Sequence, residues 1–155
     1  MTIASVDGTA QETGFLVNTR QTAITPISGT IGEMAGMNIT GNAAGSLIRG
    51  TLEFNASAAS SGNSTGIQEG AVAAGQSLYA NLHVTAAAGT TLDVVVQSDN
   101  SGAFSSATSR ITFTQATGLT SEHLSVAGAI TDDYFRVNYT IVGGSFTFCV
   151  CFGIL

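Results

Sequence analysis

Hydrophobic and polar residues alternate along most of the chain, as they do in β-strands that bury one face. The strictest alternation lies in the range 131–155, on two runs separated by Gly143 and Gly144. Their apolar positions are Phe135, Val137, Tyr139 and Ile141, followed by Phe146, Phe148, Val150, Phe152 and Ile154. Because glycine tolerates the positive φ of a tight turn, we predict a long β-hairpin with Tyr139 opposite Phe148. The same register sets Phe135 opposite Phe152.

Five further alternating runs predict strands over 46–56, 76–85, 91–97, 109–114 and 122–130. The stretch 57–75 is rich in Ser, Ala and Gly, and we interpret it as a long loop. No amphipathic helix of normal length is evident. Short strands at regular spacing predict an all-β fold, an antiparallel β-sandwich. Eight strands in two sheets make a jelly roll the leading candidate, with an immunoglobulin-like arrangement as the alternative.

The first third of the chain differs from the rest. Residues 1–48 are polar, small and glycine-rich, and they alternate only weakly. We expect short strands at 22–28 and 37–40, and Pro26 confines the first to an edge. The pattern therefore predicts an extended N-terminal arm over 1–48 and a β-sandwich domain over 49–155. An arm of this length is expected to lie on a partner or on a neighbouring subunit.

The chain is poor in charge. Only 9% of its 155 residues are charged and the formal net charge is −6, whereas roughly 25% is usual. Lysine is absent, and the basic residues are Arg20, Arg49, Arg110 and Arg136. Nucleic-acid binding requires clustered Lys or Arg, so we expect none. No window reaches the roughly 18 apolar residues of a membrane helix, and the first residues lack the pattern of a secretory signal. We therefore expect synthesis in a cytoplasm and contact with another protein through a weakly charged surface.

Few residues suggest chemistry. His83 and His123 lie on predicted strands, and no serine stands in the context of a nucleophile elbow. Cys149 and Cys151 are two apart on one strand, roughly 6.5–7 Å, which suits a disulfide poorly. The further ligands that a metal would need are not evident. We expect free, half-buried thiols, no enzymatic activity, no catalytic or metal-binding residues and no cofactor.

Two acidic segments and one arginine have alternative interpretations. Asp132 and Asp133 point to opposite sides of a strand and make a poor acid–base pair, so they form either a solvated turn or a weak cation site. The segment 98–102 (SDNSG) resembles a calcium loop only slightly, because it lacks the acidic repeat. Arg136 is placed for an interfacial hydrogen bond or for a salt bridge with Asp132 or Asp133.

Three aromatic residues, Tyr79, Phe104 and Tyr134, are expected to point outward. Together they would form a platform for a sugar ring. The alternative is that each packs at an interface or at the rim of the sandwich. The first interpretation requires the three side chains to share one surface.

The runs GTTLDVVVQSDNSGAF (89–104), RITFTQATG (110–118) and TDDYFRVNYTIVGGSFTFCVCFGI (131–154) resemble small virion proteins of tailed bacteriophages. They are most similar to the head decoration, or cement, proteins, and the resemblance covers about residues 75–155. It implies a jelly-roll sandwich on the outside of the capsid, where it bridges and stabilises major capsid subunits. It also implies self-association as a homodimer or homotrimer.

Two other functions remain open at this point. One is a tail- or neck-associated virion sandwich, and the other is a carbohydrate-binding module. The expected partners are the major capsid protein and a second copy of the chain, and not nucleic acid or a membrane. We expect the arm and the loop at 57–75 to make the contacts.

Overall fold

The computed structural model describes the backbone of residues 2–5, 8–28 and 36–155, and these residues form strands and no helix. No segment among them is therefore a helix that could span a membrane. The strands are β1 (Thr2–Ser5), β2 (Glu12–Val17), β3 (Thr19–Ser28), β4 (Gly36–Ala43), β5 (Ile48–Ala58), β6 (Gly62–Asn63), β7 (Ile67–Gln68), β8 (Ser77–Ala87), β9 (Thr91–Asp99), β10 (Thr108–Thr112), β11 (Thr120–Ala127), β12 (Tyr134–Val142) and β13 (Phe146–Ile154).

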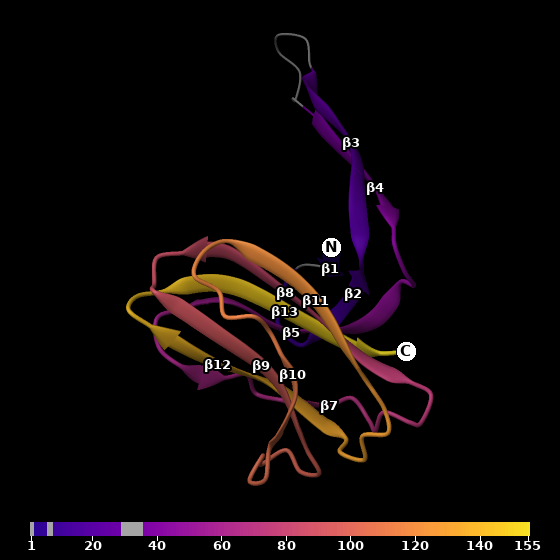
Figure 1. The fold of residues 1–155 in the computed structure, drawn as a ribbon, viewed down its shortest axis with the longest axis vertical. Helices are drawn as coiled ribbons and strands as arrows, with labels where there is room; N and C mark the ends of the chain where they lie inside the picture. The colour runs from indigo at the N-terminus through magenta and orange to yellow at the C-terminus, as the bar shows by residue number, and fades with distance from the viewer. Residues whose placement is uncertain (1, 6–7, 29–35) are drawn as a thin grey trace.

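The strands form two antiparallel sheets that pack face to face, with a two-stranded arm outside them (Figure 1). The larger sheet has the order β1-β2-β5-β13-β8-β11, and the smaller has the order β10-β9-β12-β6, with β7 also pairing with β12. The predicted antiparallel β-sandwich is confirmed.

The strand order is that of a jelly roll. Leaving the arm and the two N-terminal strands aside, the ladders pair β5 with β13, β6 with β12, β8 with β11 and β9 with β10. The chain thus runs through β5, β6, β8 and β9 and returns through β10, β11, β12 and β13, each returning strand pairing with an outgoing one. These four antiparallel pairs fold into two layers of four strands.

The predicted hairpin of residues 131–155 is wrong. β12 pairs with β9 in the smaller sheet, whereas β13 pairs with β5 and β8 in the larger one. Gly143 (φ +69°) and Gly144 (φ +137°) carry the chain from one sheet to the other. The residues expected to be ladder partners instead meet across the core: Tyr139 and Phe148 contact edge to face at 5.3 Å between ring centroids.

The core fills the space between the sheets and is built from the apolar face of each strand. Its fully buried members include Phe135, Val137, Phe146, Phe148, Val150 and Phe152 from the last two strands and Leu78, Ala80, Leu82 and Val84 from β8. The core residues of β8 recur at every second position, as expected for the alternating strand predicted over 76–85. Each buried Leu, Val or Phe side chain contributes about 1.5–3 kcal/mol, which makes this layer the main source of stability.

The N-terminal third divides into two parts. β1 and β2 join the larger sheet, where β2 pairs with β5, so these two strands differ from the expected extended arm. β3 and β4, which include the strands expected at 22–28 and 37–40, pair with each other and project from the sandwich (Figure 1). The division into an arm over 1–48 and a domain over 49–155 stays a prediction.

The expected loop at 57–75 is partly strand. β6 and β7 pair with the outer edge of β12, and Ser64 accepts a hydrogen bond from the backbone N–H of Val137 at 2.8 Å. These short contacts cover the edge of the smaller sheet. They also hold the stretch against the sandwich rather than leaving it as a free loop.

Candidate functional site

The arm formed by β3 and β4 belongs to neither sheet of the sandwich. At its base the backbone N–H of Ala44 donates to the carbonyl of Asn18 at 2.6 Å, which closes the ribbon. Beyond this point the two strands have extensive contacts only with each other among the described residues. A lone two-stranded ribbon is marginally stable in water, so its position favours a contact with another molecule.

The base of the arm carries exposed apolar side chains and a small hollow. Leu47 is 62% exposed and Leu155 is 50% exposed. The hollow has a volume of about 190 Å³, and its lining comprises Asn18, Ala44, Gly45, Ser46, Ile48, Tyr79, His123 and Leu155. It lies where the arm leaves the larger sheet and offers mainly apolar contacts.

His123 and Tyr79 stack within this hollow, with ring centroids 5.8 Å apart. The His123 imidazole also contacts the Asn81 side-chain oxygen, and burial lowers the pKa of His123 below its usual value. His83 lies two residues further along the same face of β8, and burial lowers its pKa as well. Both rings therefore favour the neutral form at pH 7 and act as packing groups on the outer face of the larger sheet.

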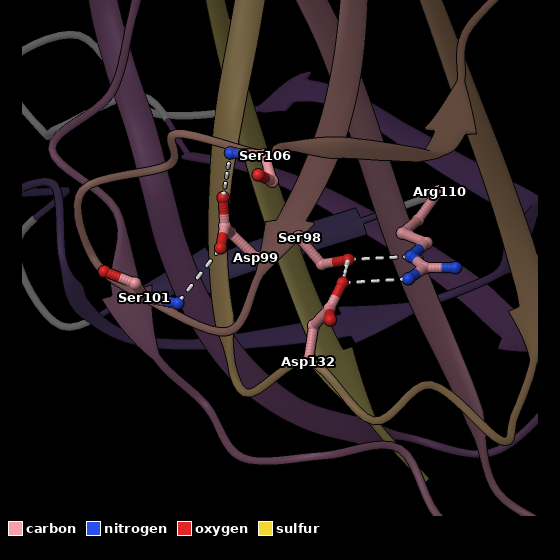
Figure 2. A network of polar contacts seen from close by, with 6 residues as sticks. All are labelled: Ser98, Asp99, Ser101, Ser106, Arg110 and Asp132. Carbon is pink, nitrogen blue, oxygen red and sulfur yellow. Dashed lines mark hydrogen bonds and ion pairs between the residues drawn. The ribbon is translucent and has the colours of Figure 1, made fainter.

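A polar network fixes the end of the sandwich that carries the segment 98–102 (Figure 2). The Ser98 hydroxyl donates to Asp132 Oδ2 at 2.6 Å and accepts from Arg110 Nε at 2.7 Å. Arg110 Nη2 also pairs with Asp132 Oδ2 at 2.8 Å. The hydrogen bond from Ser98 is the main cause that holds the pKa of Asp132 below its usual value, and the hydrogen bond from Arg110 is the next largest. The solvated turn expected at Asp132 is wrong, because Asp132 is only 8% exposed.

This network has no reactive group. Ser98 is fully buried, so its hydroxyl is out of reach of a substrate, and its hydrogen bonds to Asp132 and Arg110 serve the packing of this end of the sandwich. Asp133, by contrast, accepts a hydrogen bond from Gln68 Nε2 at 2.6 Å at an exposed position. The two aspartates therefore have different partners and do not converge on a cation.

The segment 98–102, which resembles a calcium loop only slightly, is held by hydrogen bonds within the loop. The carboxylate of Asp99 accepts backbone N–H groups from Ser101 at 3.2 Å and from Ser106 at 2.8 Å (Figure 2). Asp99 is 6% exposed, so its oxygens serve the loop itself. Within the described residues no group of three or more His, Cys, Asp or Glu side chains is arranged to hold a metal ion.

The aromatic platform is not assembled. Phe104 is 8% exposed and lies beneath Arg136, whose guanidinium carbon is 4.4 Å from the ring centroid. Tyr134 is on β12 of the smaller sheet, whereas Tyr79 is on β8 of the larger sheet. The salt bridge considered for Arg136 is replaced by a hydrogen bond from its Nε to Gln97 at 3.0 Å, and Arg110 is the partner of Asp132.

The two cysteines are free, as expected, and Cys149 is half-buried, but the half-buried state expected for Cys151 is wrong. Cys151 is fully buried in a second apolar cluster with Leu16, Ile48 and Leu52, on the outer face of the larger sheet. Burial raises the pKa of Cys151 to about 12, and burial raises the pKa of Cys149 as well. Neither thiol is activated as a nucleophile, because the thiolate is the reactive form.

A buried carboxyl escaped the sequence analysis. Glu53 on β5 is 1% exposed, and its Oε1 accepts the backbone N–H of Gly66 at 3.1 Å. A register shift between Val150 and Cys151 in the β5–β13 ladder interrupts the alternation at this point, so Leu52 and Phe54 pack in different clusters. Burial raises the pKa of Glu53. In the alternation of 46–56, Glu53 is on the face opposite to that of Leu52 and Phe54, so the sequence pattern did not predict its burial.

Comparison with known proteins adds no assignment. No protein-family model matches the chain, and no curated protein matches it in sequence.

Proposed function

We propose that the protein is a capsid decoration protein of a tailed bacteriophage. In this proposal it binds the outside of the phage head and stabilises contacts between major capsid subunits. The sequence resemblance of residues 75–155 to decoration proteins supports the proposal, as does the jelly-roll sandwich that the resemblance implied.

The observation that carries the proposal is the free-standing arm. A compact sandwich with a projecting two-stranded ribbon is suited to join neighbouring positions on a repetitive surface (Figure 1). At ~3.3 Å per residue, β3 alone extends for roughly 33 Å, which is comparable to the diameter of a small domain. The sandwich would occupy one position on the shell while the arm reaches the next.

The mechanism is thermodynamic. A protein that binds the assembled shell and not its dissociated subunits stabilises the shell by mass action. Each contact is individually modest, but a shell repeats it many times, and linked contacts reinforce one another. The low charge of the chain suits close contact between surfaces, because few charged groups lose their water on binding.

The test is co-sedimentation of the full chain with mature, undecorated capsids of the same phage. We expect saturable binding at a fixed ratio to the major capsid protein, with decorated shells more resistant to heat. Absence of binding, with the protein recovered in tail fractions of purified virions, would overturn the proposal in favour of the tail- or neck-associated alternative.

A further inference from the structure

We infer that the arm of one copy pairs with the free edge of β11 in a second copy, so that the protein associates with itself by adding strands to a sheet. This inference names the partner of the arm, and it is tested on the protein without capsids. An unpaired sheet edge is a template for another strand, so the free edges of the two sheets and of the arm decide which contacts are available.

Most sheet edges in the described residues are short or irregular. β6 and β7 have two residues each, and β1 has four. β10 has five residues and a register shift between Ser109 and Ile111. Short length and bulges are the usual protections against edge-to-edge pairing, so these edges are poor acceptors.

The edge formed by β11 lacks those protections. β11 has eight residues, pairs with β8 without a register shift, and contains neither proline nor lysine. Its one charged residue, Glu122, already accepts hydrogen bonds from the backbone and the side chain of Thr114. The strand ends the larger sheet, and among the described residues no backbone hydrogen bond joins it to a strand other than β8.

The alternation of the ladder shows which amides of β11 face outward. The N–H of Gly128 donates to Gln76, which continues the unbroken register of β11 with β8. In an antiparallel ladder the residues alternate between facing the partner strand and facing away from it. The even-numbered residues therefore bond to β8. The outward groups belong to Ser121, His123, Ser125 and Ala127.

The arm has a matching free edge. Both register shifts in the β3–β4 ladder insert an extra residue in β3, which also contains Pro26. β4 is the regular strand, has eight residues like β11, and contains neither proline nor a charged side chain. Its outer edge therefore has the length and regularity that β11 can pair with, and no like charges oppose the contact.

The acceptor edge belongs to another copy, because the arm projects away from its own sandwich (Figure 1). β3 and β4 make extensive contacts with no other strand of the same chain among the described residues. Each copy thus has one donor edge and one acceptor edge. Two copies can each place their arm on the β11 edge of the other, or several copies can do so around a closed ring. In either arrangement the β4 edge and the β11 edge of every copy are paired.

The test compares Ser125→Pro with Ser125→Ala at the centre of the acceptor edge. Proline removes one outward N–H but leaves the bonds to β8, whereas alanine keeps that N–H. In sedimentation velocity from about 1 µM to about 1 mM, wild type and S125A should reach a discrete multiple of the 15.6 kDa chain. The association constant of S125P should fall about tenfold or more, since an interstrand hydrogen bond and the close approach of the strands are both lost.

Amide hydrogen exchange in the wild type provides a readout that requires no variant to fold. On association, the amides of Ser121, His123, Ser125 and Ala127 should gain protection, while the even-numbered amides, already bonded to β8, should change little. A monomer at every concentration, equal association of S125P and S125A, or protection without this alternation would overturn the inference. Protection of β11 that appears only when capsids are added would also overturn it, because the shell would then be the partner. Failure of capsid binding alone leaves the self-association result unaffected.

Discussion

Replacing Asp132 with alanine is expected to destabilise the sandwich by about 2–4 kcal/mol at pH 7. The carboxylate accepts the Ser98 hydroxyl at 2.6 Å and pairs with Arg110 at 2.8 Å. Ser98 is fully buried, so the loss of its acceptor costs about 1–3 kcal/mol. The Arg110 side chain is 26% exposed, so water replaces part of its lost partner, and about 1 kcal/mol is added.

The assay is urea unfolding followed by far-ultraviolet circular dichroism, because the chain has no tryptophan to report by fluorescence. Asp133→Ala is the matched control at the next position. Its carboxylate accepts a hydrogen bond from Gln68 at an exposed site, so we expect a change within about 0.5–1 kcal/mol.

The pH dependence provides the decisive comparison. The hydrogen bonds from Ser98 and Arg110 lower the pKa of Asp132 in the folded state. The stability that this group contributes is therefore complete above the unfolded pKa of about 3.9 and is lost as the pH falls through the folded pKa. The difference in the free energy of unfolding between wild type and Asp132→Ala should become smaller as the pH falls from about 4 to about 2. A difference below about 1 kcal/mol at pH 7, or one that does not narrow in acid, refutes the reasoning.

Two other substitutions test the interior and the sheet-to-sheet turn. Glu53→Gln should become more stable relative to wild type as the pH rises from about 4 to 8. Burial raises the pKa of Glu53, so the wild type loses the favourable protonated form above that pKa, whereas glutamine does not ionise. A urea midpoint difference that stays constant over this range contradicts the prediction. Gly144→Ala should cost about 1–3 kcal/mol in the same assay, since φ at this position is +137° and a Cβ would meet the carbonyl of Ala88. Gly45→Ala is its control, with open space around it, and equal costs at the two positions would rule out backbone strain as the cause.

Local alternation identified most of the strands and their buried faces. β8 and β9 match the predicted ranges 76–85 and 91–97 within a few residues, and their inward residues are those of the core. Alternation succeeds there because both strands lie inside their sheets, and the register shift between β8 and β13 comes only after Val84, the last inward residue of β8. It fails at Glu53, where a register shift in the ladder places a carboxyl in the interior.

The last two strands show why pairing is harder to predict than strands. Apolar residues that match across a ladder also match across two packed sheets, so the pattern of 131–155 could not distinguish a hairpin from a turn between sheets. The predicted jelly roll and the predicted hairpin were inconsistent with each other. In that topology the last two strands lie in opposite sheets, as β12 and β13 do.

The sequence by itself determined the class of the fold, the buried faces of regular strands and the free state of the two thiols. These properties depend on residue type and on spacing along one strand. The tertiary structure alone decided the partner of Asp132, the separation of the three aromatics and the existence of a free β11 edge opposite a projecting arm. Those properties depend on which distant strands become neighbours, and that choice follows from the packing of the whole core rather than from any local run of residues.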